Sequence, residues 1–346
     1  MISPQFRTHT SELMNFRQFI AWSEEARHLA PEAERYCETR IAQAFSRLRV
    51  VPDAACKSLR IHRCDLVRLW CKAMGIPNLA HMTLATEGVR HSLQAIFALL
   101  AKGSAKVAMP TDVYPVYWQL ATAEKLRVVG FETFPQFNLW KILADAEEAG
   151  AHHVLLPQPL KLQGRSWTDK EIATAEDWLR AGIQRRIILD GVYGFGAPLD
   201  SPTKRLIETD QVVFLDSLSK GWLHERTFGA AVIPEQDASI YTEPLRNLPS
   251  TPSKLLIAHQ LIERFSDIPY RVRGEIDALR FEVLGRVSRI RSLTLPVERG
   301  YFLPIECSTE RLLTEHSMVT IPASVFGSRL RHWSVASVLP ATDLSS

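Results

Sequence analysis

The sequence lacks the features that mark membrane proteins, nucleic-acid-binding proteins and secreted proteins. Its 41 lysines and arginines nearly balance 38 aspartates and glutamates, which leaves a net charge of +3, and the basic residues form no dense block. The most apolar stretch, LQAIFALLA at 93–101, is far shorter than a membrane span. The N-terminal MISPQFRTHT lacks the apolar core of a signal peptide. We therefore expect a soluble protein with no nucleic-acid or membrane partner.

Cysteine is also scarce. The five cysteines form an odd set without a C-x-x-C pair. A disulfide framework is therefore not expected, and the cytoplasm is the predicted compartment. His62 and Cys64 lie close together, but no second pair follows at the spacing of metal ligands. No metal site is predicted.

What the sequence does have is an ordinary globular composition, with 46% hydrophobic and 23% charged residues, and a regular alternation of elements. Short apolar runs alternate with helical stretches from about residue 80 to 235, which is typical of a parallel sheet with right-handed helical crossovers. The predicted strands are 82–86, 107–110, 126–131, 153–156, 186–189, 212–215 and 228–233.

The pattern predicts three parts. Residues 1–60 form a helical segment that packs on the small domain or at a dimer interface, residues 61–244 form a large α/β domain, and residues 245–346 form a small α+β domain. Within these parts we predict three helix-capping positions and a C-terminal series of one helical region and four strands. Asp65 caps a helix that Gly75 ends, Thr168 begins another, and residues 252–290 are amphipathic helix before strands at 293–295, 301–305, 318–321 and 332–338.

The stretch VVFLDSLSKGWLHERTFG, at 212–229, is the most informative one. It places Lys220 at the mouth of two apolar runs, where desolvation and a neighbouring cation lower an amine's pKa and favour the neutral form that attacks a carbonyl. Ser217, Ser219 and Arg226 supply donors for an anion such as a phosphate. These groups are those needed to hold pyridoxal phosphate as a Schiff base. The alternative is a turn with a solvated lysine.

Two other strand ends carry polar groups. Gly88, Val89 and Arg90 lie between a strand and a helix, where free N–H groups and the helix dipole form an anion site. Asp190 ends a buried strand and Tyr193 follows three residues later. A carboxylate there can face the nitrogen of a pyridine ring, and the phenol can bond another ring substituent. The alternatives are an ordinary strand–helix turn and a helix-capping aspartate.

An aromatic residue and two arginines are weaker candidates. Tyr114 follows a strand, so its ring can stack on a flat heteroaromatic ligand or form a packing corner with Pro115. Arg329 and Arg331 precede the last predicted strand. A guanidinium that faces the cleft binds a substrate carboxylate with two hydrogen bonds, whereas an exposed arginine is the alternative.

The order and spacing of these motifs resemble those of the class I/II aminotransferases, which are fold-type-I pyridoxal-phosphate enzymes. The resemblance covers about residues 60 to 340 and implies an α/β large domain with a mostly parallel seven-stranded sheet, beside a smaller α+β domain. It also implies pyridoxal 5'-phosphate, an amino acid and a keto acid as substrates, and a homodimer with a shared active site. The motifs are Glu87-Gly88-Val89-Arg90, Tyr114-Pro115, Asp190-Gly191-Val192-Tyr193, Ser217-Leu218-Ser219-Lys220 and Pro322–Gly327.

The resemblance assigns a role to each residue. Lys220 is implied as the Schiff-base lysine and proton shuttle, Asp190 as the partner of the ring nitrogen and Tyr193 as the partner of the ring hydroxyl. Tyr114 is implied to stack on the ring, and Arg331, or Arg329 as the alternative, to bind the substrate carboxylate. The residues implied around the phosphate are Gly88, Val89, Arg90, Ser217, Ser219 and Arg226.

One loop departs from the family pattern. Residues 158–164 read QPLKLQG, so Lys161 replaces the asparagine that bonds the ring hydroxyl in the family. Because one carbanion intermediate feeds several reactions and local groups choose among them, a second cation favours elimination, decarboxylation, cyclisation or oxidation as the alternative to amino transfer. The departures favour a divergent member in specialised metabolism. A non-catalytic binding module on the same fold is a third hypothesis.

Overall fold

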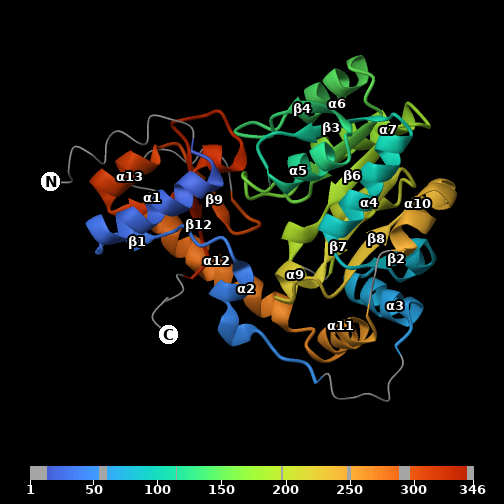
Figure 1. Ribbon diagram of the computed structural model, residues 1–346, viewed down its shortest axis with the longest axis horizontal. Helices are drawn as coiled ribbons and strands as arrows, with labels where there is room; N and C mark the ends of the chain where they lie inside the picture. The colour runs from blue at the N-terminus through green and yellow to red at the C-terminus, as the bar shows by residue number, and fades with distance from the viewer. Residues whose placement is uncertain are drawn as a thin grey trace.

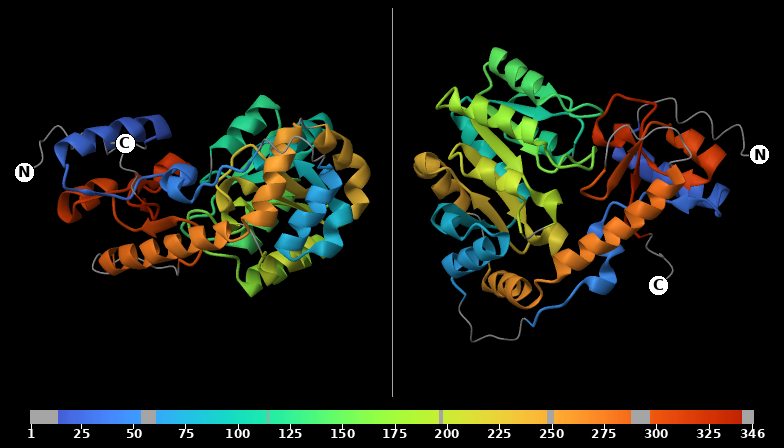
Figure 2. Two further views of the ribbon diagram at one scale, coloured as in Figure 1. Left: turned by 90° about the horizontal axis from the view of Figure 1, so that it is seen from below. Right: turned by 180° about the vertical axis from the view of Figure 1, so that it is seen from behind.

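The computed structural model describes residues 14–53, 61–113, 115–195, 198–247, 251–287 and 297–340. They form two lobes connected by the long helix α12 (Ile268–Val287), which runs from one lobe to the other (Figures 1 and 2). We call the elements from α3 to α11 the large lobe, and the elements α1, β1, β9–β12 and α13 the small lobe. Tyr114 and the whole strand predicted at 293–295 lie outside the described residues.

The large lobe is built on a seven-stranded sheet with the order β2-β8-β7-β6-β5-β3-β4. Strands β3 to β7 run parallel, whereas β8 is antiparallel to both of its neighbours, β7 and β2. The predicted mostly parallel sheet is confirmed. The strands are β2 (Thr83–Thr86), β3 (Lys106–Pro110), β4 (Arg127–Phe131), β5 (His153–Pro157), β6 (Arg186–Asp190), β7 (Val212–Ser217) and β8 (Gly229–Val232).

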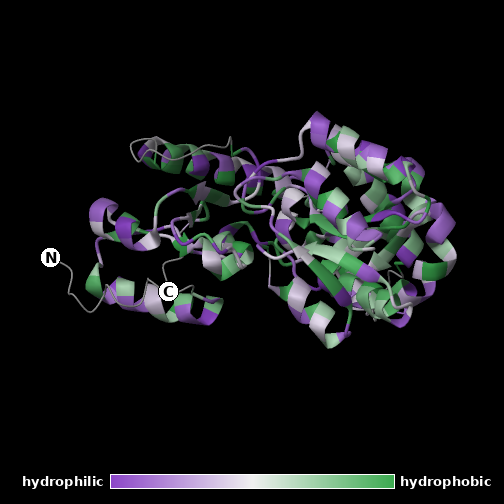
Figure 3. Cartoon of the chain, turned by 90° about the horizontal axis from the view of Figure 1, so that it is seen from above, coloured by the Kyte–Doolittle hydropathy of each residue, from purple (hydrophilic) through white to green (hydrophobic). Residues whose placement is uncertain are grey.

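The central strands form the core of this lobe. Every residue of β6 and β7 is buried, as expected for strands that helices cover on both faces. The strands inside the large lobe are mostly coloured as hydrophobic in Figure 3, while the helices around them alternate between hydrophobic and hydrophilic residues. The helices of the large lobe are α3 (Arg63–Met74), α4 (Val89–Lys102), α5 (Val116–Ala123), α6 (Leu139–Glu148), α7 (Asp169–Arg180), α8 (Ser201–Ile207), α9 (Leu218–Gly221), α10 (Ala238–Arg246) and α11 (Pro252–Arg264).

Two helix ends follow the sequence prediction and one does not. Thr168 caps α7 through a reciprocal capping box with Glu171, and Gly75 ends α3 in the left-handed conformation. The prediction that Asp65 caps α3 is wrong, because His62 occupies that position. Asp65 lies in the first turn instead, where its carboxylate faces the positive end of the helix dipole and pairs with Arg68.

The helix predicted over 252–290 is interrupted. The helix α11 ends at Arg264, and α12 begins at Ile268. Pro269 is the second residue of α12, and its missing N–H suits the start of a helix but would remove a hydrogen bond from a continuous one. None of the helices in the described residues combines the length and the apolar character that a membrane crossing requires.

The small lobe contains an antiparallel sheet of three strands in the order β11-β12-β9. The N-terminal part of the chain joins it, because β1 pairs with β10 in parallel register. From β1 the chain continues through α2, which contacts α9 of the large lobe. The elements are α1 (Phe16–Leu29), β1 (Glu34–Arg35), α2 (Ile41–Ala44), β9 (Phe302–Ile305), α13 (Thr309–His316), β10 (Met318–Val319), β11 (Ile321–Pro322) and β12 (Ser334–Ser337).

Candidate active site

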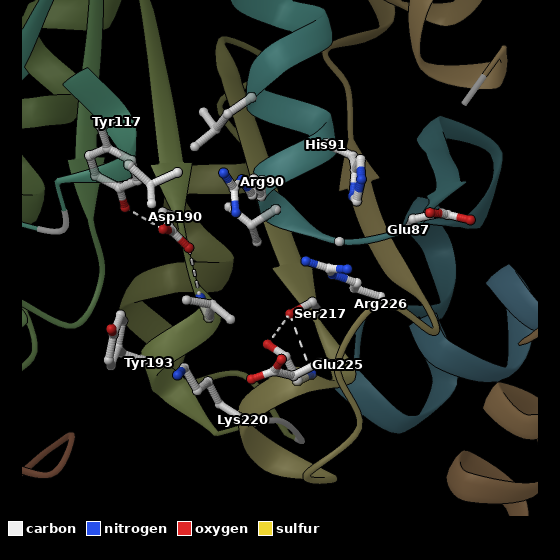
Figure 4. Close-up of a pocket in the computed structure, with 16 residues that line it drawn as sticks. Glu87, Arg90, His91, Tyr117, Asp190, Tyr193, Ser217, Lys220, Glu225 and Arg226 are labelled. Carbon is white, nitrogen blue, oxygen red and sulfur yellow. Dashed lines mark hydrogen bonds between the residues drawn. The ribbon is translucent and has the colours of Figure 1, made fainter. Parts of the chain in front are cut away.

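Three strand ends meet at one edge of the large sheet. Gly229, the first residue of β8, pairs with Ser217 of β7 on one side and with Thr86 of β2 on the other. Asp190 ends β6 and pairs with Leu215 of β7. Because β2, β6 and β7 run in the same direction, the loops that follow them lie together at their carboxyl ends. The strand register thus brings three separate sequence motifs to one cavity (Figure 4).

The first of these motifs forms the N-terminus of α4. Gly88 precedes the helix with a φ of 130°, makes no side-chain cap, and is followed by a first turn without acidic residues. Gly229 passes so close that a Cβ added to it would lie 2.4 Å from the Cα of Gly88. The helical ladder starts with the N–H of Ser92, so the N–H groups of the first turn remain available to an anion.

Two serines and two arginines surround this helix end. The Ser217 and Ser219 hydroxyl oxygens lie 2.7 Å apart. Arg90 and Arg226 are exposed, and both line the cavity beside the serines (Figure 4). The cavity also contains the carboxylate of Glu225, directly before Arg226. The arrangement presents hydroxyls, backbone N–H groups and two cations to one point, which suits a phosphate.

Asp190 marks the other end of the cavity. The residue is 3% exposed, and its carboxyl group accepts hydrogen bonds from the hydroxyl of Tyr117 and, at 3.1 Å, from the N–H of Val192. Burial raises the pKa of Asp190, while these two donors and the amines of Lys161 and Lys220 oppose that shift. The carboxyl group is therefore held in one orientation at the end of a rigid strand.

Lys220 lies between these two ends on the short helix α9. Its amino group is half-buried, 3.4 Å from the hydroxyl oxygen of Tyr301 and 5.6 Å from the ring centroid of Tyr193. The Tyr301 hydroxyl donates to the carbonyl of Thr39 at 3.4 Å, so the N-terminal segment reaches the site. Burial raises the pKa of Tyr193 well above its usual range, which keeps the phenol protonated as a donor.

Lys161 occupies a different environment from Lys220. It is 5% exposed, and its amino group lies 4.8 Å from the ring centroid of Phe326, 5.2 Å from that of Tyr193 and 5.3 Å from that of Phe302. Burial and the positive charge of Lys220 lower the pKa of Lys161 to about 7, although Asp190 opposes the shift. The amine can therefore gain and lose a proton near neutral pH.

The structure brings most of the predicted residues together. The cavity measures about 200 Å³. Lys161 is not among the described residues that line it, but its amino group lies 5.2 Å from the ring centroid of Tyr193, which does. Arg329 and Arg331 are exposed in the small lobe and are not among the described residues that line the cavity. The predicted residues that do line it are Gly88, Val89, Arg90, Asp190, Tyr193, Ser217, Ser219, Lys220 and Arg226.

Two tyrosines that contact Asp190 and Lys220 were not predicted. Tyr117 follows Tyr114 by three residues, so the aromatic cluster after β3 was a usable signal. Tyr301 carries no local signal, because it reaches Lys220 from the small lobe, 81 residues away in sequence. No group of three or more potential metal ligands occurs in the part of the chain that the structure describes.

Comparison with solved structures identifies the architecture. YbdL from Escherichia coli, reported to have a methionine aminotransferase function, aligns with a TM-score of 0.70 and 17% identity over 97% of this chain and 94% of its own. An aromatic aminotransferase from Pyrococcus horikoshii aligns with a TM-score of 0.67 and 16% identity over 92% and 94%. A putative PLP-dependent beta-cystathionase from Corynebacterium diphtheriae aligns with a TM-score of 0.64 and 15% identity, over 86% of this chain and 82% of its own.

The similarity to known proteins is found by comparing structures and not by comparing sequences. No family model matches the sequence, and no curated protein matches it. Identities of 15 to 17% are too low to transfer an activity, but the alignments extend over 86 to 97% of this chain and 82 to 94% of the other chains. The chain therefore has the fold of the fold-type-I aminotransferases, as the resemblance of its motifs predicted.

Proposed function

We propose that the chain is a pyridoxal-phosphate-dependent aminotransferase that acts on an amino acid and a keto acid, with Lys220 as the lysine that carries the cofactor. The observation that supports this most is one cavity with a half-buried primary amine between an anion site and a buried carboxylate. Each group alone is common in proteins. Their combination at the carboxyl edge of this fold is specific.

The residues fit the two ends of the cofactor. The first turn of α4, the Ser217 and Ser219 hydroxyls, Arg90 and Arg226 provide donors and positive charge for a phosphate dianion. At the opposite end, Asp190 offers a buried carboxylate for a protonated ring nitrogen, and Tyr193 offers a phenol for the ring hydroxyl. We propose that Tyr114, which follows β3, stacks on the ring.

The protein groups then have defined roles. When bound, pyridoxal phosphate acts as an electron sink for the bonds of the substrate α-carbon. The neutral amine of Lys220 would move the proton from the substrate α-carbon to the cofactor C4′, with Tyr301 directing the amine through the contact at 3.4 Å. Asp190 stabilises positive charge at the ring nitrogen, because burial and two fixed donors keep its oxygens in place.

We propose Arg331 for the substrate carboxylate, with Arg329 as the alternative. Both are exposed on the segment between η6 (Ala323–Phe326) and β12, and this segment approaches the loop after β3. A Cβ added to Gly327 would lie 2.1 Å from the carbonyl oxygen of Thr111. We propose that a movement of the small lobe brings an arginine of this segment to the cavity mouth.

A lyase, decarboxylase, cyclase or oxidase on the same cofactor is the second candidate. Lys161 is the observation that favours it, because a second buried amine near Lys220 could deliver a proton to a different atom and so change the reaction that the cofactor supports. We further propose a homodimer that shares its active site and a role in specialised metabolism in the cytoplasm. The odd number of cysteines supports the cytoplasm.

The test is the absorbance spectrum of the purified protein with pyridoxal phosphate, before and after borohydride. We expect a visible band that borohydride abolishes, that is missing in Lys220→Ala, and that persists in the control Lys141→Ala, whose lysine is exposed and pairs with Asp145. Amino acid alone should convert the cofactor to pyridoxamine phosphate; recovery of the starting spectrum favours the second candidate. A protein that stays colourless contradicts the proposal.

A further inference from the structure

Glu87 brings a carboxylate to the end of the cavity that is proposed to bind phosphate. It follows β2 and directly precedes Gly88 at the start of α4, and it lines the same cavity as Arg90 and Arg226. The residue is only 8% exposed. Like charges repel more strongly where water is largely excluded. A negative charge in this position would therefore oppose the binding of a phosphate.

An ion pair with Lys254 of α11 holds this carboxylate. The amino group of Lys254 lies 2.7 Å from the Oε1 of Glu87, although the two residues are 167 positions apart in the sequence. A carboxylate that is largely buried is costly without a cation beside it. Figure 4 shows the Glu87 side chain extending away from Arg90 and Arg226. Lys254 thus neutralises the carboxylate and holds it on the side that faces α11.

The position of Lys254 within its own helix supports a role outside that helix. Lys254 is the third residue of α11, where the positive end of the helix dipole disfavours a cation. The first turn of α11 contains no acidic residue that would offset this cost. The pairing with Glu87 explains a lysine at this position better than the stability of α11 does.

We propose that Lys254 is a positioning residue for the phosphate site, because it binds the carboxylate of Glu87 and cancels a charge that would otherwise repel the phosphate. Lys254 acts through Glu87 rather than by contact with the ligand. The inference deepens the proposed function and rests on it, since it takes this end of the cavity as the phosphate site. It predicts that the net charge of the pair, and not the bond between its members, decides the affinity for phosphate.

The experiment measures the binding of inorganic phosphate and of pyridoxal phosphate to the full chain by isothermal titration calorimetry. The variants are Lys254→Met, Lys254→Gln, Glu87→Gln and the double variant Glu87→Gln/Lys254→Met. The two lysine variants leave the carboxylate without Lys254, whereas Glu87→Gln leaves the cation. Lys141→Met and Asp145→Asn are the matched controls, because each breaks an exposed ion pair of similar length, 2.6 Å, on α6.

We expect Lys254→Met and Lys254→Gln to weaken the binding of both ligands by about tenfold, which is the effect of one added like charge near a partly hydrated site. Glu87→Gln should leave the affinity unchanged or raise it, although it breaks the same ion pair. The double variant should restore the affinity of the wild type, because both charges are then removed. The two controls should have no effect.

The proposal is overturned if all variants bind alike, or if Glu87→Gln weakens binding as Lys254→Met does, because the bond itself would then matter. It is also overturned if the double variant binds as weakly as Lys254→Met, because Lys254 would then contact the phosphate directly. Lys254→Gln decides if thermal unfolding shows that Lys254→Met is misfolded. A chain that binds inorganic phosphate but not pyridoxal phosphate contradicts the proposed function alone, and one that binds neither contradicts both.

Discussion

The two ends of the candidate site are built in different ways. The proposed phosphate end, formed by the start of α4, two serines and two arginines, rests on neighbouring strands of one sheet, where Gly88 and Gly229 are in close contact. The amine end combines Lys161 and Lys220 of the large lobe with Tyr301 and Phe326 of the small lobe. The first is fixed by strand register, whereas the second depends on how the lobes meet. Cofactor binding should therefore tolerate changes between the lobes that alter reactivity.

The largest expected effect comes from Gly229→Ala at the phosphate end. The new Cβ would lie 2.4 Å from the Cα and 2.6 Å from the nitrogen of Gly88, so backbone must move. We expect a loss of about 3 kcal/mol in the free energy of unfolding and a clear loss of affinity for pyridoxal phosphate, measured by urea unfolding and by titration.

The matched control is Gly274→Ala in α12, where no atom lies within 4 Å of the added Cβ. A glycine in a helix is replaced there by a better helix former, so the change should be stabilising by up to about 1 kcal/mol. Equal behaviour of the two alanine variants would contradict the close packing of the phosphate end.

Asp190→Asn has the next largest expected effect, and it acts on the side of the cavity opposite the phosphate end. Asparagine keeps the shape of the side chain but removes the charge, so turnover should fall by about 100-fold while the fold is retained. Asp216→Asn is the control, because Asp216 does not line the cavity and burial already favours its uncharged acid. Steady-state kinetics compare the two; similar losses would show that buried charge at Asp190 has no special role.

Glu171→Gln tests which contacts stabilise the loop at 158–164, which contains Lys161. Arg165 and Glu171 form an ion pair with side chains 14% and 13% exposed. Burial by itself would raise the pKa of Glu171, but hydrogen bonds from Arg165 and Thr168 lower it overall. The carboxylate therefore stabilises the fold above its unfolded pKa of about 4.3, and this contribution is lost as the pH falls through the lower folded value.

The variant should lose about 2 kcal/mol of unfolding free energy at neutral pH, and the difference from the wild type should shrink in acid. Urea unfolding at both pH values measures it. A difference that stays the same in acid would mean that the loop does not depend on the charge of Glu171.

Tyr301→Phe has the smallest expected effect. It keeps the ring packing but removes the hydroxyl that connects Lys220 with Thr39, at a cost of about 1 kcal/mol. The rate of cofactor attachment, followed by stopped-flow absorbance, should fall a few-fold with little change in affinity. Tyr270→Phe, at an exposed tyrosine on α12, is the control. A large loss of affinity would show that the two ends are not independent.

The sequence predicted most of the sheet and most of the residues that gather at the proposed phosphate end, because these rest on local patterns. Each motif occupies only a few residues of the sequence. One is a strand followed by a glycine and a helix, and the others are strands that end near Asp190 or Ser217. Lys220, Ser219 and Arg226, which line the cavity, were predicted for the same reason.

The amine end was less predictable, because its contacts join distant segments. Nothing near Tyr301 indicates that it reaches Lys220, and nothing near Lys161 reveals the three rings around its amine. The wrong cap at Asp65 and the undetected break between α11 and α12 have another cause. Several residues can serve at a helix end, and neighbouring structure decides which one does.

The most direct test of the proposed chemistry is a peptide map of the protein after incubation with pyridoxal phosphate and reduction with borohydride. Two buried or half-buried amines, Lys161 and Lys220, approach the same Tyr193 ring, and only one of them is proposed to carry the cofactor. We predict that the phosphopyridoxyl group is found on Lys220. Its recovery on Lys161, or its absence from both lysines, would contradict the assignment of Lys220 as the catalytic amine.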